Sequence, residues 1–303
     1  MNANNLFLKT FGVITSIGMV VVLIQGVLVT QTGSGDACGA EWPLCLGQIF
    51  PESPTIQTLI EYTHRVVSGL LGMMVISLAI WSWKKLSHIR ETRFFAIVAI
   101  LFIVFQGLLG AAAVVWGQSD AIMALHFGFS LISLTSVVLL TCLAFENNIS
   151  KLLVRPTMSR AMANYIYFVL VYVYFVVYTG AYVKHTESSA ACVGWPLCNG
   201  QIIPSLSDPQ IAVQFGHRVA AASLFIVILA WYIQLWRNYR GQKLLHYVGL
   251  ISLLFITTQV ISGAVVVFSG YTLAASMFHA IFISLLFTVV SYGALLAFRS
   301  NQE

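Results

Sequence analysis

Four histidines are spaced so that they could bind iron in pairs. They are His64, His126, His217 and His279, and 153 residues separate His64 from His217 and His126 from His279. The chain has seven histidines, and only these four obey this spacing. Each lies near the start of a long apolar segment, where an ionisable side chain is costly and therefore indicates a functional site. Two imidazoles on neighbouring helices can take both axial positions of a haem, so the sequence predicts two haem sites.

A structural role is the alternative for any one of these histidines. A single polar side chain in an apolar helix often makes a hydrogen bond that stabilises helix packing. Four histidines at repeated positions, each pair at one predicted depth, favour metal ligands instead.

The composition indicates a polytopic membrane protein. Of the 303 residues, 59% are hydrophobic and only 8% are charged, whereas soluble proteins carry about 25% charged residues. The net charge of +5 comes from basic residues in short loops between apolar segments, which is a topology signal. We therefore expect contact with membrane lipid and no nucleic acid partner.

The chain contains eight apolar runs that are long enough to cross a bilayer of about 30 Å. The first run exceeds the ~7–15 residues of a signal-peptide core, so we expect it to be retained. The predicted spans are approximately 11–30, 62–83, 94–116, 122–145, 164–183, 213–236, 247–268 and 273–297.

Basic residues predict the orientation of these spans. Lys and Arg concentrate in the connections 84–93, 151–160 and 237–243, whereas the stretch 31–60 contains neither. The positive-inside rule then places both termini in the cytoplasm and the two long loops, 31–60 and 184–212, outside the cell membrane.

The two outer loops are copies of each other, and they reveal a repeat. Cys38 and Cys45 enclose Trp-Pro-Leu, as do Cys192 and Cys198, with one residue fewer in the second loop. Each half, 1–150 and 151–303, therefore contains four spans. Because four is even, both halves have the same orientation and are related by a pseudo-two-fold axis along the membrane normal. The predicted fold is an all-α integral membrane protein of two tandem four-helix bundles.

The two cysteine pairs favour a disulfide within each loop. Outside the cytoplasmic membrane the setting is oxidising, so Cys38–Cys45 and Cys192–Cys198 are predicted to be bonded. A structural staple is favoured for Cys192–Cys198. For Cys38–Cys45 a redox-active pair stays open as an alternative.

The halves differ at one position that matters for chemistry. Glu61 lies three residues before His64 and therefore on the same helix face. Gln214 occupies the matching position before His217. A carboxylate can accept a proton or stabilise positive charge, so the asymmetry places chemistry in the first half. The alternative is a surface carboxylate that caps its helix.

Two arginines directly follow histidines, at Arg65 and Arg218. A guanidinium binds carboxylates well, so these residues are candidates for binding haem propionates. The alternative is an interfacial arginine that reaches lipid headgroups.

Over nearly its whole length, the sequence resembles the haem A synthases of the Gram-positive bacterial type. The resemblance rests on several motifs together. They are Thr-Gly-Ser-Gly at 32–35, both Cys…Trp-Pro-Leu-Cys loops, Glu61-x-x-His64-Arg65, Leu-His-Phe-Gly at 125–128, Tyr-Thr-Gly-Ala-Tyr-Val at 178–183, Gly-His-Arg at 216–218 and His279.

This resemblance implies an eight-helix membrane oxidoreductase that converts haem O to haem A for the terminal haem-copper oxidase. The methyl group at ring position eight would become a formyl group through a hydroxymethyl intermediate. Glu61 would be the catalytic carboxylate, His64 and His126 would hold the substrate haem, and His217 and His279 would hold a permanent haem b. A haem O synthase (protohaem farnesyltransferase) is the expected protein partner.

Two other classes of protein are consistent with parts of the pattern. A dihaem electron-transfer cytochrome b would need both histidine pairs but not Glu61. A transporter or haem exporter would need polar residues at mid-membrane, whereas the ionisable residues predicted within spans crowd the outer edge.

Overall fold

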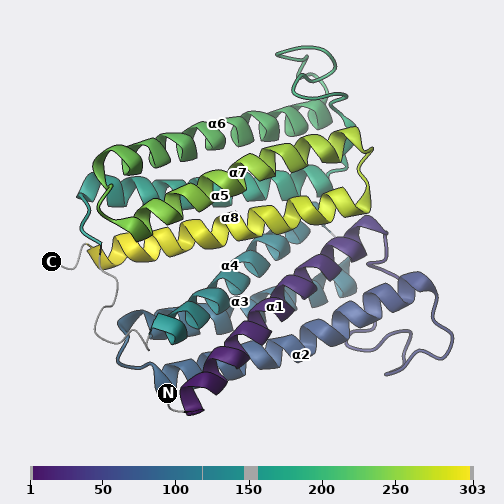
Figure 1. The fold of residues 1–303 in the computed structure, drawn as a ribbon. Helices are drawn as coiled ribbons and strands as arrows, with labels where there is room; N and C mark the ends of the chain where they lie inside the picture. The colour runs from purple at the N-terminus through teal and green to yellow at the C-terminus, as the bar shows by residue number, and fades with distance from the viewer. Residues whose placement is uncertain (1–2, 118, 147–155, 301–303) are drawn as a thin grey trace. The chain divides into compact units, whose positions relative to one another are not determined.

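The computed structural model describes residues 3–117, 119–146 and 156–300, and the long elements in these ranges are α-helices (Figure 1). A short 3₁₀ turn, η2, spans Ser188–Ala190. The eight helices are α1 (Ala3–Gln31), α2 (Ile56–Lys85), α3 (Arg90–Trp116), α4 (Asp120–Glu146), α5 (Arg160–His185), α6 (Pro209–Asn238), α7 (Lys243–Phe268) and α8 (Leu273–Ser300).

Each of these eight helices is long and apolar enough to cross a membrane, which confirms the predicted number of spans. All the helices except α8 begin earlier than the apolar runs suggested, and side-chain caps account for this at α2 and α6. Thr55 caps α2 by accepting a 3.1 Å hydrogen bond from the Thr58 backbone, and Asp208 caps α6 in the same way at Gln210, at 2.8 Å. Because of these caps, both helices begin before their apolar segments. Glu61 therefore lies inside α2.

The chain divides into two compact units, Met1–Leu153 and Val154–Glu303. In the first unit α1 packs on α2 and α4, and α3 packs on α2 and α4, so the four helices form a closed ring (Figure 1). In the second unit α5 to α8 repeat this order. The predicted boundary between residues 150 and 151 lies outside the described residues. The pseudo-two-fold relation between the halves stays a prediction.

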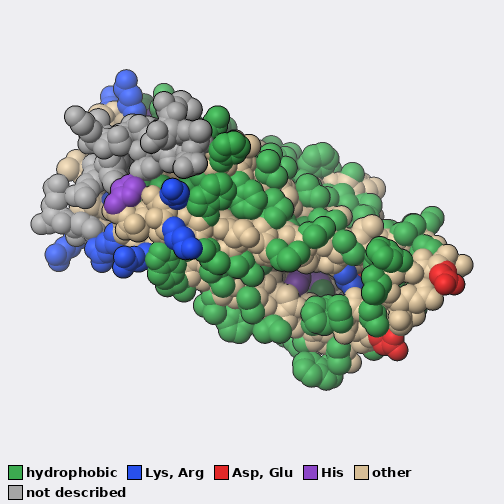
Figure 2. All heavy atoms as spheres, turned by 90° about the horizontal axis from the view of Figure 1, so that it is seen from below, with side chains coloured by type: hydrophobic (Ala, Val, Ile, Leu, Met, Phe, Trp, Pro, Cys, Tyr) green, Lys and Arg blue, Asp and Glu red, His purple; other side chains and the backbone are tan. Residues whose placement is uncertain are grey.

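Charged side chains are separated along the surface that Figure 2 shows. Lys and Arg gather toward one end of a largely apolar surface, and Asp and Glu lie at the other end. A hollow nearer the acidic end exposes a histidine side chain. This distribution is typical of a membrane protein with one basic side.

The two cysteine loops fold alike. Disulfides join Cys38 to Cys45 and Cys192 to Cys198. After the second cysteine of each loop a two-residue turn closes on a glutamine, Gln48 in the first loop, through paired backbone hydrogen bonds. Both turns place their central residues at positive φ, including Asn199 at 54°, as two-residue hairpin turns require. The repeat seen in the sequence is therefore a repeat in structure.

Candidate haem sites and the buried carboxylate

The helices place the histidines of each pair at similar heights. His64 and His217 are the ninth residues of α2 and α6, and His126 and His279 are the seventh residues of α4 and α8. At 1.5 Å per residue, all four lie about 9–12 Å from the starts of their helices. The two rings of each pair are near enough to interact electrostatically. The structure thus brings together the residues that the sequence paired.

Each histidine ring packs against a glycine of the preceding helix in the chain. A Cβ on that glycine would lie 2.8 Å from the ring of His217 and 3.2 Å from the ring of His279. For His126 and His64 the corresponding distances are 3.3 Å and 3.6 Å. The four pairs are Gly26–His64, Gly110–His126, Gly180–His217 and Gly263–His279. At Gly180, Gly263 and Gly110 an added Cβ would be closer to the ring than ordinary van der Waals contact allows, whereas at Gly26 it would fit.

These residues fit an iron porphyrin with two imidazole ligands. Each unit supplies two histidine rings that are half-buried and packed against a glycine. A side chain at Gly180 or Gly263 would fill the space that the ring occupies. The donor set of two neutral imidazoles matches the axial ligands of b-type haem.

The hydrogen bonds of the two pairs differ. In the second unit, the Nδ1 atom of His217 lies 3.0 Å from the Thr179 hydroxyl, and that of His279 lies 2.8 Å from the Ser262 hydroxyl. Among the described residues, the buried Nδ1 atoms of His64 and His126 have no hydrogen-bond partner. The symmetric histidines therefore have asymmetric surroundings.

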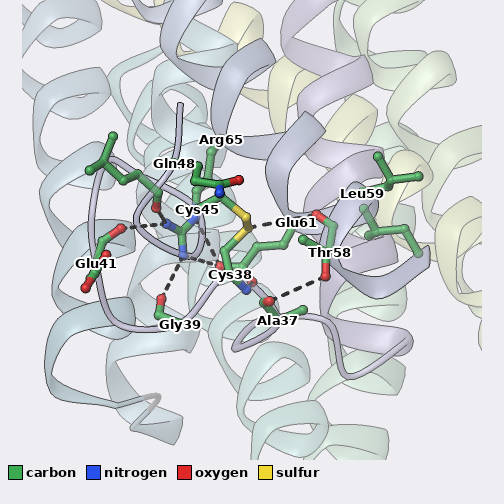
Figure 3. The surroundings of a disulfide bond; sticks show 12 residues. Ala37, Cys38, Gly39, Glu41, Cys45, Gln48, Thr58, Leu59, Glu61 and Arg65 are labelled. Carbon is green, nitrogen blue, oxygen red and sulfur yellow. Dashed lines mark hydrogen bonds and ion pairs between the residues drawn. A yellow bond between two sulfur atoms is a disulfide. The ribbon is translucent and has the colours of Figure 1, made fainter. Parts of the chain in front are cut away.

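Glu61 is almost completely buried, with 3% of its surface exposed. Its Oε2 atom accepts a 2.7 Å hydrogen bond from the backbone N–H of Cys38. Its Oε1 atom accepts from Nε of Arg65 at 3.0 Å and forms an ion pair with the same guanidinium (Figure 3). A surface capping role is excluded, because the N-cap of α2 is Thr55 and the carboxylate lies beneath the disulfide loop.

Arg65 fastens the first cysteine loop to α2. Besides Glu61, its guanidinium donates to the backbone carbonyls of Gly39, Glu41 and Leu44, at 3.3, 3.4 and 2.8 Å (Figure 3). Together these contacts use all five N–H groups of the guanidinium. Binding of a propionate by Arg65 stays a prediction, and it requires one of these contacts to open.

Arg218 plays the same part in the second loop without a carboxylate. Its guanidinium donates to the carbonyls of Cys192, Gly194 and Leu197, each at 2.9 Å. The neighbouring Gln214 donates to the Ser189 carbonyl at 3.2 Å, and its Oε1 atom has no partner among the described residues. The arginine that anchors the loop is thus shared by both units, whereas the buried carboxylate beside it in the first unit is replaced by Gln214 in the second.

The motif at 178–183 contains Thr179 and Gly180, but sequence reasoning gave them no role beside His217, and it did not single out Ser262 or Gly26. A signal was present, because 154 residues separate Gly26 from Gly180, one more than separate the histidines. The change in spacing follows from the residue missing between Cys192 and Cys198. A comparison at both spacings would have aligned Gly26 with Gly180.

Comparisons with known proteins identify the family of this chain. The model of a family described as cytochrome oxidase assembly protein matches residues 9–291. A haem A synthase from Halalkalibacterium halodurans is 52% identical over 297 residues, which cover 97% of this chain and 98% of the relative. Haem A synthases from Alkalihalophilus pseudofirmus and Shouchella clausii are 49% and 50% identical, over 97% and 98% of this chain and 99% of each relative. The chain therefore belongs to the cytochrome oxidase assembly protein family that includes the haem A synthases.

Proposed function

We propose that this chain oxidises the methyl group at ring position eight of haem O to the formyl group of haem A, which serves the terminal haem-copper oxidase. Family membership supports this reaction. The observation that carries the site assignment is the buried carboxylate of Glu61, next to one histidine pair, where Gln214 stands beside the other. A purely electron-transferring dihaem protein would have no need of this difference.

The first unit is the proposed substrate site. His64 and His126 lie at similar heights in α2 and α4 and would hold haem O through its iron. Their glycine contacts, at Gly26 and Gly110, let the rings lie close to the neighbouring backbones. The first unit is therefore the catalytic half of the proposed enzyme.

The second unit is the proposed site of a resident haem b, held by His217 and His279. A haem b with two imidazole ligands supplies one-electron transfer when bound. The hydroxyl groups of Thr179 and Ser262 already orient both rings. The neutral Gln214 leaves this half without an acid–base group at the matching position.

Glu61 is the proposed catalytic carboxylate. In a site from which water is excluded, a carboxylate can accept a proton or stabilise positive charge that develops beside it. Arg65 and the Cys38 N–H hold both of its oxygens. These contacts hold the buried carboxylate in one place, which is what a group waiting for substrate needs.

The proposal also includes a protein partner and an orientation in the membrane. A haem O synthase is the expected protein partner, because haem O is insoluble in water and must be delivered within the membrane. The apolar helix surfaces contact lipid. Both termini would be cytoplasmic, and both cysteine loops would be extracellular, where their disulfides are stable.

The experiment that tests this function is expression with a haem O synthase in cells that lack haem A, followed by chromatography of the extracted haems. Haem A is expected only when both proteins are present. Haem b with unaltered haem O would instead support the dihaem electron-transfer protein, and would contradict the proposal.

A further inference from the structure

The hydroxyl group beside His217 fixes which ring nitrogen carries the proton. Thr179 Oγ1 lies 2.8 Å from the Val176 carbonyl and 3.0 Å from His217 Nδ1. A carbonyl only accepts, so the single hydroxyl proton is directed to Val176. The hydroxyl oxygen must then accept from the imidazole. His217 is therefore protonated at Nδ1, and its Nε2 keeps a free lone pair.

The same reasoning applies to His279, with an independent check. Ser262 Oγ donates to the Gln259 carbonyl at 2.9 Å, so it accepts from His279 Nδ1 at 2.8 Å. The Gln259 side-chain nitrogen lies 3.1 Å from His279 Nε2. An amide nitrogen only donates, so Nε2 must be the unprotonated atom. Both rings of the second pair thus carry a lone pair at Nε2, and at His279 the Gln259 amide must release this atom before it can bind iron.

The first unit lacks both hydroxyl groups. At the spacing of 154 residues Thr179 aligns with Gln25, and at 153 residues Ser262 aligns with Leu109. Leu109 has no polar atom, and the buried Oε1 of Gln25 has no hydrogen-bond partner among the described residues. His126 faces the backbone of Gln106, but its Nδ1 makes no hydrogen bond within the described part of the chain.

We propose that Thr179 and Ser262 are positioning residues that lock His217 and His279 onto a permanent haem, and that Gln25 and Leu109 leave the other pair unlocked so that its haem can exchange. An acceptor at Nδ1–H fixes the ring and makes Nε2 a stronger ligand. A substrate haem must leave as product, so weaker ligands suit the first pair. This inference rests on the proposed function, which assigns the resident haem to the second unit.

The test compares Thr179→Val and Ser262→Ala, alone and together, in the purified haem-loaded protein. Two readouts apply: the reduction midpoint potential of haem b, and the rate of haem transfer to excess apomyoglobin. The potential should rise, because a less basic ligand stabilises ferric iron less. Haem transfer should become about 10-fold faster.

Matched controls separate this role from a general loss of packing. Thr257→Val and Ser252→Ala remove hydroxyl groups from α7 that, within the described residues, bond to the helix carbonyls of Leu253 and Val248. Both controls should leave the potential and the transfer rate as they are in the parent protein. The conservative change Thr179→Ser keeps the hydroxyl. This variant should therefore have the midpoint potential of the parent protein, whereas Thr179→Val should have a higher one.

Two outcomes would overturn the inference, and only the second would also contradict the proposed function. An unchanged potential and transfer rate in the double variant, with full haem b content, would remove the positioning role and leave the proposed function intact. Retention of haem b at full content in His217→Ala would show that the second unit does not hold it. That result would overturn the haem assignment of the proposed function as well.

Discussion

The Oε2 atom of Glu61 accepts a 2.7 Å hydrogen bond from the backbone N–H of Cys38, a residue of the first disulfide. The carboxylate and the loop are therefore one structural unit, and the path of the loop decides where the carboxylate sits. In the second unit the amide of Gln214 contacts the loop at Ser189 and carries no charge. A change in the first loop is thus expected to reach the proposed chemistry, whereas a change in the second is expected to act on haem retention.

Replacing Arg65 by Met should strongly destabilise the protein. The change leaves the buried Glu61 carboxylate without its cation, a loss that typically costs about 3–5 kcal/mol. The thermal unfolding temperature of the detergent-purified protein should fall, and Glu61→Gln in the same chain should restore part of it. Arg218→Met is the control, since Arg218 holds loop carbonyls without a carboxylate. Equal losses in the two arginine variants would argue against a stabilising ion pair.

Removal of the two disulfides, one at a time, should have different effects, because each disulfide shapes the loop of one unit. Replacing Cys38 and Cys45 by Ala should lower haem A formation while haem b content stays near that of the parent. Replacing Cys192 and Cys198 should mainly lower haem b content. Each loop closure is worth roughly 2–3 kcal/mol.

The temperature dependence of the Cys38/Cys45 variant distinguishes a staple from a redox pair. A staple predicts that haem A formation recovers when the cells are grown colder, because the loop refolds onto Glu61. A redox-active pair predicts no haem A at any temperature. Recovery is the result that the structure favours, since both oxygens of Glu61 are held by groups other than sulfur.

Gly180→Ala should reduce the haem b content of the purified protein several-fold. The added Cβ would lie 2.8 Å from the ring of His217, and that ring is also held by Thr179, so it cannot move without breaking a hydrogen bond. Gly69→Ala is the matched control, because a Cβ there meets no atom within 4 Å. Pyridine haemochrome spectra measure the content. Full haem b in Gly180→Ala would contradict the close seating of the ring.

Labelling of single cysteines tests the predicted sidedness. Ser205 lies exposed between α5 and α6, and Gly241 lies exposed between α6 and α7. A membrane-impermeant maleimide should label Ser205→Cys in intact cells and Gly241→Cys only after lysis. The reverse pattern would invert the predicted topology.

The sequence predicted the eight spans, the repeat and the pairing of histidines because these depend on local hydropathy and regular spacing. Helix starts were less accurate. The predicted second span began at residue 62, whereas α2 begins at Ile56. An apolar run identifies only the part of a helix that lies in the hydrocarbon core of the membrane. The start of α2 is set by the capping hydrogen bond of Thr55, which lies before that run.

The surroundings of the site residues were beyond sequence reasoning. Arg65 has three carbonyl partners in the loop, and these depend on the path of the backbone and not on residue type. The contacts of Thr179 with His217 and of Ser262 with His279 depend on how neighbouring helices are rotated. Hydropathy does not encode this rotation.

The central claim is that Glu61 performs chemistry in the first unit while the second unit holds a resident haem. Chromatography of haems extracted from the Glu61→Gln variant, expressed with a haem O synthase, tests it most directly. The variant keeps the size of the side chain and copies the residue found at Gln214. Haem A should fall at least about 100-fold, with haem O accumulating and haem b at the parent level, whereas the mirror change Gln214→Glu should keep haem A formation. Parent levels of haem A in Glu61→Gln would contradict the account.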